Sequence, residues 1–468
     1  MQTMKKLIFY HTIIQSPIVV FCVAMGLRLL VLCVTQLPHD ELKKGDASEY
    51  LELGKNLIQV HQFAVSNSSG YQPNLHRTPG YPLYVALHQL FFSDPLIPLY
   101  LSQSLLTSLL CLICYSLAKK LNCSVPIIAA WIIAIDPALI HFSLTPLSDS
   151  LLVFMIGLGI YTLFRWKETG SMLWFVSSAL SLSLSAWTKP IGMFLWIFML
   201  PFFWFVGGPV KTRLFRMALW TLLFTLPIGL WIARNDYVAQ APLFSTITGI
   251  NTYSYRAAGV KAKLENISVL EAQRLLNEEA DRFALAHHPT DYEMDIFFRT
   301  KGMDYIMSHP FIYTQVQVNG MLCALFGPSF RYILWRAGFP QSGLGLLSGL
   351  HSGTFRSQLK QLITKGILPI LVAGGECFYL LILYILAIYA IYHFRKRPRW
   401  LFYLLIALFL YFLGLAGGPE AGARLRIPLM PMMAALSTCG IDSLLQSWKR
   451  NIQKLFPAEM VGDSTSAK

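Results

Sequence analysis

LIPLYLSQSLLTSLLCLICYSLAKK, residues 96–120, is an apolar run that ends in two lysines. About 20 helical residues cross the hydrocarbon layer of a bilayer, so the run 96–117 predicts a membrane-spanning helix. The rest of the chain is similar: 55% of its 468 residues are hydrophobic and 13% are charged, with a mean hydropathy of +0.51. A single soluble core cannot hide this much apolar surface, so we predict an integral membrane protein.

Comparable apolar runs predict about ten spans in all. They lie at 17–37, 96–117, 125–143, 148–165, 172–188, 191–207, 217–234, 367–393, 399–416 and 426–445. Threading these spans from a cytoplasmic N-terminus brings the short basic clusters to one side: Lys5/Lys6, Lys119/Lys120, Arg165/Lys167, Lys211/Arg213/Arg216, Arg395/Lys396/Arg397/Arg399 and Lys449/Arg450/Lys454. This is the positive-inside pattern. Membrane topology therefore explains the net charge of +14, nucleic-acid binding is not predicted, and both termini are expected in the cytoplasm.

The threading also divides the chain into four parts. They are an N-terminal transmembrane module at 1–234 with a first outer loop at 38–95, an outer region at 235–366, C-terminal transmembrane helices at 367–446, and a cytoplasmic tail at 447–468. Two capping-box spacings, Ser268 with Glu271 and Thr290 with Glu293, predict helix starts in the outer region. The predicted fold is an all-α polytopic membrane protein with in-plane juxtamembrane helices and a small outer helical domain.

The segment DASEYLELGKNLI, residues 46–58, predicts one in-plane helix, because its apolar residues follow helical i, i+3, i+4 spacing. Asp46 is expected at the N-cap of this helix, with Glu49 three residues later. Capping alone would account for both acids. A catalytic role for Asp46 is the alternative.

Charged residues on the predicted outer face favour that alternative. Asp149 begins the fourth span, Lys189 lies between the fifth and sixth, and Arg424 and Arg426 precede the last. The stretch HRTPGYP, residues 76–82, adds His76 and Arg77 beside turn residues and Tyr81. Each basic residue alone is compatible with snorkelling, and the stretch with an interfacial loop anchored by Tyr81. Together they predict a pocket for an anion at the membrane surface, such as a lipid phosphate, with Asp46 as a nearby proton acceptor.

Other motifs give no support to competing classes. The run GLGLLSG, residues 343–349, has Ser348 where a dinucleotide-binding loop needs its last glycine. No P-loop, H-E-x-x-H or EF-hand pattern occurs. Most of the eight cysteines fall within predicted spans, so no disulfide framework is expected.

Five segments, in this order, resemble the lipid-carrier-dependent glycosyltransferases of the GT-C fold around glycosyltransferase family 39. They are GDASEYLELGKNLI, HRTPGYPLY, LTPLSD, TKPIG and ARLRIPLMP. That group includes protein mannosyltransferases and the aminoarabinose transferases of lipid A. The similarity runs along most of the chain, whereas 235–366 matches only in general character.

The resemblance implies transfer of a sugar from a polyprenyl-phosphate donor to a lipid, glycan or protein acceptor, with inversion, on the non-cytoplasmic face of a bacterial inner membrane. Asp46 would be the catalytic base or orienting carboxylate. The implied substrate-binding residues are Arg77, Asp149, Lys189, Arg424, Arg426, Tyr81, His76 and Glu49. Some relatives have two adjacent acids in the first loop, whereas Ala47 and Ser48 follow Asp46 here. A divalent metal or other cofactor is therefore not supported by the sequence.

Two other classes are compatible with a polytopic chain. A transporter or flippase of lipid-linked sugars would need polar breaks near the bilayer midplane, for which Asp136-Pro137 is the candidate. A membrane scaffold without chemistry predicts that each outer-face charge can be replaced singly.

Overall fold

The protein is an α-helical bundle in the computed structural model, which describes residues 16–35, 43–68, 70–336, 367–393 and 399–455. Six of the described helices are long and apolar enough to cross a membrane: α2 (Pro17–Val34), α6 (Leu96–Lys120), α9 (Asp149–Thr169), α12 (Val210–Ala239), α21 (Ile367–Tyr392) and α23 (Met430–Leu455). Three apolar helices are shorter: α10 (Met172–Thr188), α11 (Leu195–Phe205) and α22 (Arg399–Leu415). With one interrupted helix these elements correspond to the ten predicted spans, so the predicted helical polytopic fold is confirmed.

The interrupted helix occupies the predicted span at 125–143 and is broken at Asp136-Pro137, the candidate break named from the sequence. It consists of α7 (Ile127–Ile135) and α8 (Pro137–Ser143), separated at Asp136. Proline cannot continue the hydrogen-bond ladder of the preceding helix. Asp136 adopts an extended conformation and accepts a hydrogen bond from the backbone N–H of Leu139 at 2.9 Å, which makes it the N-cap of α8. This hydrogen bond satisfies one of the backbone N–H groups at the start of α8.

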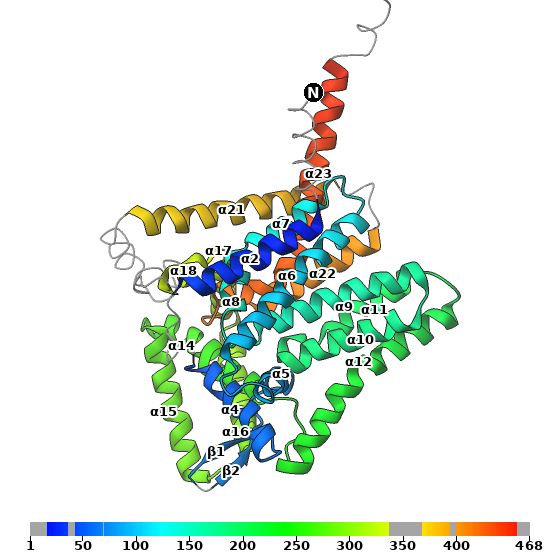
Figure 1. The fold of residues 1–468 in the computed structure, drawn as a ribbon. Coiled ribbons are helices and arrows are strands. Elements are labelled where there is room, and N and C mark those ends of the chain that lie inside the picture. The colour runs from blue at the N-terminus through cyan, green and yellow to red at the C-terminus, as the bar shows by residue number, and fades with distance from the viewer. Residues whose placement is uncertain (1–15, 36–42, 69, 337–366, 394–398, 456–468) are drawn as a thin grey trace, which may run out of the picture.

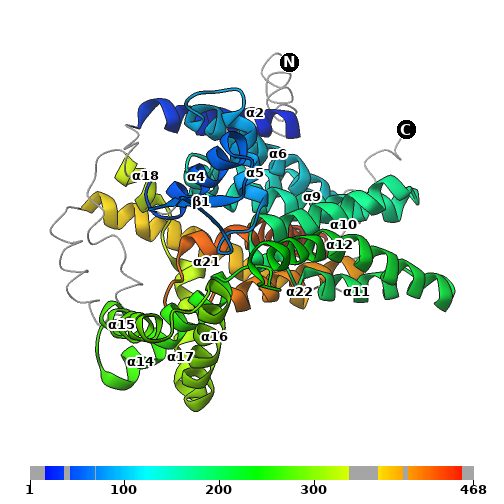
Figure 2. The same cartoon turned by 90° about the horizontal axis from the view of Figure 1, so that it is seen from below.

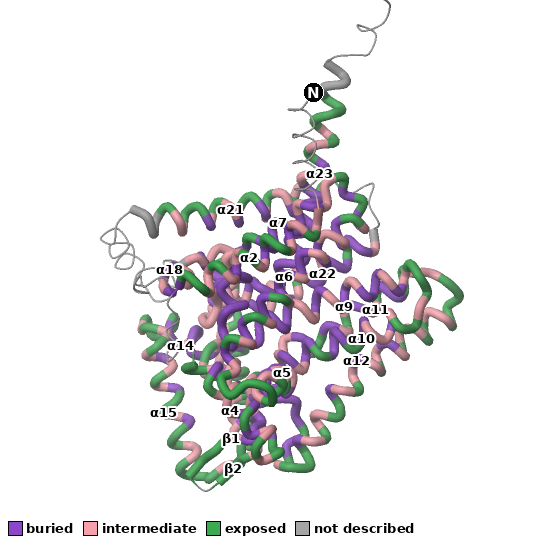
Figure 3. Tube along the Cα trace, viewed as in Figure 1, coloured by how far each residue is buried: buried purple, intermediate pink, exposed green. Residues whose placement is uncertain are grey.

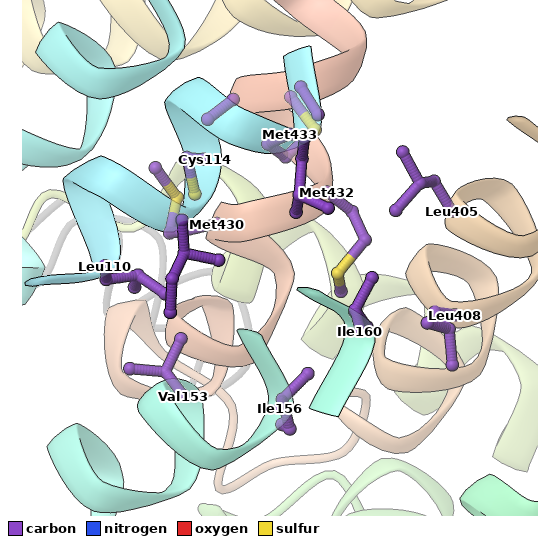
Figure 4. Packing of buried hydrophobic residues seen from close by; sticks show 14 of the residues in the cluster. Leu110, Cys114, Val153, Ile156, Ile160, Leu405, Leu408, Met430, Met432 and Met433 are labelled. Atoms are coloured by element: carbon purple, nitrogen blue, oxygen red, sulfur yellow. The ribbon is translucent and has the colours of Figure 1, made fainter. Parts of the chain in front are cut away.

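The centre of the bundle is built around the first half of α23. Met430, Met432 and Met433 are at most 1% exposed. Figure 4 shows them among side chains of α6, α9 and α22, including Leu110, Ile156 and Leu405. Unbranched methionines fill irregular gaps between helices. Figure 3 shows the same division, with buried residues concentrated where these helices meet and exposed residues along the projecting end of α23.

Peripheral helices expose apolar side chains. Leu30 on α2, Leu230 on α12 and Leu371 on α21 are each about 60% exposed. In water such surfaces would be costly. In a bilayer they face lipid, as the hydropathy of these three helices predicts.

A small polar layer covers one end of the bundle. It contains α4 (Asp46–Gln59), the antiparallel strands β1 (Ala64–Asn67) and β2 (Gly70–Pro73), and α5 (Gly80–Gln89). Helix α5 begins at Gly80, within the HRTPGYP stretch. In Figure 1 the strands lie at the end of the molecule opposite to the projecting part of α23.

The predicted outer region contributes further helices. They are α13 (Ile247–Ile250), the π-helix η2 (Asn251–Ala257), α14 (Ala258–Glu265), α15 (Val269–His287), α16 (Asp291–Ser308), α17 (Pro310–Phe326) and α18 (Phe330–Arg336). Both predicted helix starts are confirmed: Ser268 caps α15, and Thr290 with Glu293 forms a complete capping box on α16. Figure 2 shows α14, α15 and α16 grouped on one side, away from α10–α12. The glycine run at 343–349 and the tail after 455 lie outside the described residues.

Candidate active site

Helix α4 presents two acids on one face, and neither caps it. The predicted capping role of Asp46 is wrong, because the N-cap is Gly45, at φ 62°. A left-handed φ of this kind favours glycine. Asp46 is the first residue of the helix, and its carboxylate points to two arginines instead.

Polar side chains from five separate segments form one continuous row of ion pairs and hydrogen bonds, here called the charge ladder (Lys189, Asp149, Arg424, Asp46, Arg77, Glu49 and His76). At one end, Lys189 Nζ lies 3.0 Å from Asp149 Oδ1, and Arg424 Nε lies 2.7 Å from Asp149 Oδ2. Arg424 Nη1 then contacts Asp46 Oδ2 at 2.8 Å. The charges expected to converge on one site therefore do so, apart from Arg426.

The other end of the charge ladder is made by α4 and the HRTPGYP stretch. Arg77 Nη2 donates to Asp46 Oδ1 and Arg77 Nε to Glu49 Oε2, each at 2.6 Å. His76 Nδ1 lies 3.1 Å from Glu49 Oε1. Arg77 is thus held by two carboxylates three residues apart on one helix face.

The glycine of HRTPGYP allows this stretch to approach the base of Lys189. A Cβ on Gly80 would lie 2.7 Å from the carbonyl carbon of Trp187 and 2.8 Å from the amide nitrogen of Thr188. Any larger residue would push the stretch away from the end of α10. Gly80 therefore allows close backbone contact between the HRTPGYP stretch and the end of α10, and this contact brings Arg77 and Lys189 into one site.

Tyr81 lies beneath the charge ladder. It is fully buried, and its hydroxyl donates to Gln103 Oε1 at 2.8 Å. Its ring meets the ring of Tyr50 edge-on at 4.8 Å, and Tyr50 in turn lies 5.0 Å from the guanidinium of Arg77. The structure therefore corrects the predicted substrate contact of Tyr81, which supports the floor of the site.

Arg426 also lies outside the charge ladder, contrary to the prediction. It is fully buried and donates to the carbonyl oxygens of Ala324, Leu325 and Gly327 at 3.0–3.2 Å, and to Glu376 at 3.1 Å. These carbonyls terminate α17, so Arg426 satisfies groups that a helix end leaves without partners. It has a structural role, two residues from Arg424.

Sequence reasoning missed two buried contributors, Asn74 and Tyr50. Asn74 accepts a hydrogen bond from the Arg77 amide and donates to Glu49 Oε1, each at 2.8 Å. Asparagine two residues before His76 is a common loop residue, so nothing distinguished it. Tyr50 lies four residues after Asp46 on the same helix face, and that spacing was the available signal.

The open part of the charge ladder contains both signs of charge. Asp46, Arg424 and Lys189 have side chains that are 34%, 27% and 21% exposed, whereas that of Asp149 is 1% exposed. An anion could therefore reach Lys189 and Arg424, and a hydroxyl could reach Asp46. Among the described residues, no three His, Cys, Asp or Glu side chains are arranged to hold a metal ion.

Burial and the arginines act in opposite directions on the acids. Burial raises the pKa of Asp46, but Arg424 and Arg77 outweigh it and leave this pKa well below its usual range. For Glu49, burial is outweighed by the hydrogen bond with His76 and the charge of Arg77, which lower its pKa to about 2. Both acids are therefore ionised at neutral pH.

The pKa of Glu49 predicts acid-dependent stability. Its folded-state pKa is lowered from 4.5 to about 2, so its contribution is present above pH 4.5 and lost as the pH falls towards 2. We expect Glu49→Gln to reduce stability by on the order of 1–2 kcal/mol at pH 7 and by little near pH 2.5. Thermal unfolding in detergent across this pH range measures the difference. Parallel stability curves for the variant and the wild type would contradict this account.

Comparison with known proteins identifies similarity over the same elements. The model of the family described as dolichyl-phosphate-mannose-protein mannosyltransferase matches residues 49–238. This range contains Glu49, Arg77, Asp149 and Lys189, but not Asp46 or Arg424. No curated protein matches the chain.

Two solved structures of one archaeal oligosaccharyltransferase share the fold of this chain. The oligosaccharyltransferase AglB from Archaeoglobus fulgidus, in complex with an inhibitory peptide and a dolichol-phosphate, superposes with a TM-score of 0.50 at 12% identity, over 97% of this chain and 52% of its own. The same enzyme, tethered to an acceptor peptide that contains the NVT sequon, superposes with a TM-score of 0.50 at 13% identity. The match covers 96% of this chain and 52% of the enzyme. ArnT from Cupriavidus metallidurans, bound to undecaprenyl phosphate, superposes with a TM-score of 0.37 at 12% identity. That match covers 93% of this chain and 79% of ArnT. The chain spans about half the length of the oligosaccharyltransferase, and the expected resemblance to the GT-C fold is confirmed.

Proposed function

We propose that this chain is an integral-membrane glycosyltransferase that moves a sugar from a polyprenyl-phosphate donor to an acceptor hydroxyl. The observation that carries the proposal is the charge ladder, in which Asp46 and two reachable cations from distant segments meet at one end of an apolar bundle. The mannosyltransferase model and the GT-C fold support the same class. Sugar transfer on a lipid carrier needs an anion site at the membrane boundary, next to a proton acceptor.

Lys189 and Arg424 are the proposed donor ligands. Both are partly exposed, and both contact Asp149, which lies at the start of the apolar helix α9. A phosphate on a lipid tail reaches this depth while the tail remains in the bilayer. Charge-assisted hydrogen bonds from the ammonium and the guanidinium would stabilise the phosphate as it gains charge on leaving.

Asp46 is the proposed acceptor-orienting base. The acceptor oxygen forms a bond to the anomeric carbon from the face opposite the phosphate. The bond between that carbon and the phosphate oxygen breaks, and its electron pair leaves with polyprenyl phosphate. The hydroxyl proton passes to Asp46, and the configuration at the anomeric carbon inverts.

The low pKa of Asp46 links donor binding to base strength. A carboxylate bound by two arginines is a weak base in the empty site. The donor phosphate competes with Asp46 for Arg424. Each hydrogen bond that Arg424 transfers to the phosphate raises the pKa of Asp46, so the base strengthens once the donor is in place.

The acceptor would approach from the other end of the charge ladder. A cleft of about 320 Å³ lies between the β-hairpin and α16 and reaches His76. Its lining combines Leu75, Met294 and Phe298 with the acids Asp291 and Asp295. This mixture suits a sugar, or another acceptor rich in hydroxyl or amino groups. Lipid, glycan and protein acceptors all remain within the proposal.

We also propose the setting of this reaction. The charge ladder would face the non-cytoplasmic side of a bacterial inner membrane, with both termini in the cytoplasm. Residues 1–234 and 367–446 would form the transmembrane part, 235–366 the outer region, and 447–468 the tail. The positive-inside distribution of lysine and arginine supports this orientation.

The test is a transfer assay with the full chain in proteoliposomes. Polyprenyl-phosphate donors carrying radiolabelled hexose or pentose are added together with an extract of the cell envelope. We expect free polyprenyl phosphate to accumulate and the label to enter an extract component. A transporter or flippase instead moves intact donor across the bilayer without cleavage, and a scaffold does neither. Either of those results would overturn the proposal.

A further inference from the structure

A second cleft lies at the far end of the helices that carry the charge ladder. It has a volume of about 520 Å³ and lies where the last turns of α6 and α9 meet the first turn of α22. Helix α9 runs from Asp149 to Thr169, and its 21 residues span about 30 Å at 1.5 Å each. The cleft is therefore at the opposite boundary of the hydrocarbon layer.

The cleft carries a large excess of positive charge. Four cations line it, Lys119, Lys120, Arg165 and Lys167, against the single carboxylate of Glu168. Four positive charges and one negative charge leave +3. Glu168 is paired with Lys120 and lies 3.5 Å from Arg165 Nη1. Each carboxylate oxygen of Glu168 thus contacts one cation, and two of the four cations have no carboxylate partner in the cleft.

Arg165 has a buried donor that lacks an acceptor. No group in the described part of the chain accepts a hydrogen bond from its Nε, and that atom is inaccessible to solvent. The side chain as a whole is 37% exposed, so the rest of its guanidinium can be reached from the cleft. Lys119 is exposed at the rim of the cleft.

Two tryptophans hold cations at the depth of lipid headgroups. Lys167 Nζ lies 3.5 Å from the centre of the Trp400 ring, and Arg165 Cζ lies 5.6 Å from that of Trp174. Tryptophan is enriched at the boundary between hydrocarbon and headgroups.

We propose that this cleft binds the headgroup of an anionic phospholipid from the leaflet opposite the charge ladder. Basic pockets between transmembrane helices recognise such headgroups by charge and by hydrogen bonds to phosphate. The positive-inside rule explains why cations gather at this end of the bundle. It does not explain a cleft between three helices in which four cations surround one carboxylate and two of them lie against tryptophan rings.

Lipid retention measured by native mass spectrometry tests the site. The full chain in detergent is incubated with dioleoyl phosphatidylglycerol or dioleoyl phosphatidylcholine. We expect the wild type to retain phosphatidylglycerol about tenfold better, and the double variant K119Q/R165Q to lose most of this preference. The double variant K211Q/R213Q is the matched control, because it removes two positive charges near the start of α12, outside the cleft.

The control variant distinguishes a specific lipid site from general attraction of anionic lipid to a positively charged surface. Retention of the preference in K211Q/R213Q, with its loss in K119Q/R165Q, supports the site. Equal loss in both double variants, or no preference in the wild type, would overturn it. If K119Q/R165Q fails to fold, Lys119→Gln alone changes only an exposed residue and is expected to lower retention about threefold. An unchanged retention in that variant would also count against the site.

Discussion

Asp46→Asn is expected to lower the rate of sugar transfer by at least about 10³-fold while leaving the fold intact. Asparagine has nearly the same shape as aspartate, but it is neutral and cannot take the proton of an attacking hydroxyl. The rest of the charge ladder persists in this variant, because Arg77 still contacts Glu49 and Arg424 still contacts Asp149. Release of polyprenyl phosphate from a saturating donor measures the rate.

Two comparisons make the Asp46 result specific. Asp304→Asn makes the same chemical change at an exposed position of α16 and should leave the rate unchanged. Donor binding, measured separately with labelled lipid, should survive in Asp46→Asn, because Lys189 and Arg424 remain. A rate within tenfold of the wild type would remove Asp46 from the chemistry and favour a binding or transport role for the site.

The spans were predictable because lipid solvation imposes a length and a composition on each of them. The exception is instructive. Asp136-Pro137 lies in a run that is apolar enough to span the membrane. Hydropathy averaged over the whole run is hardly changed by one aspartate and one proline. The local rule that proline ends a helix marks Asp136-Pro137 as a candidate break, and the structure has the break at this position.

The site residues on span ends were predictable for a different reason. Asp149, Lys189 and Arg424 have no function in topology, since they lie on the side opposite to the basic clusters. A charge that serves neither solubility nor orientation needs a partner, and here the partners are one another. The sequence could not show which cation meets which acid, because the pairing depends on how α9, α10 and the short segment before α23 pack.

Asp46 and Arg426 show where local patterns fail. Asp46 lies three residues before Glu49 at a helix start, which fits a capping box. Its carboxylate instead accepts hydrogen bonds from Arg77 and Arg424, which lie 31 and 378 positions away. Arg426 lies two residues from Arg424 in the 3₁₀-helix η4 (Ala423–Leu429). With three residues per turn, residues two apart point in different directions. Arg424 therefore faces the charge ladder, whereas Arg426 faces α17 and α21.

Arg426→Gln is expected to destabilise the protein by about 3–5 kcal/mol, the usual cost of leaving a buried charge without its partner. Glu376, which is 7% exposed, contacts Arg426 at 3.1 Å and would lose that cation. The carbonyls at the end of α17 would lose their donor as well. Denaturant unfolding in mixed micelles measures the change. Transfer activity should fall only in proportion to the folded fraction, which distinguishes Arg426 from Arg424.

Two further variants identify the buried pair as the cause. Arg274→Gln makes the same change on the exposed face of α15, where ion pairs contribute little, and should be nearly neutral. The double variant R426M/E376M replaces both charges with apolar side chains and should recover part of the loss, because no unpaired carboxylate remains in the interior. If Arg426→Gln is as stable as Arg274→Gln, Arg426 does not hold α17 to η4. If the double variant is less stable than the single one, the hydrogen bonds that Glu376 accepts from Ser329 and Phe330 contribute more than its stranded charge costs.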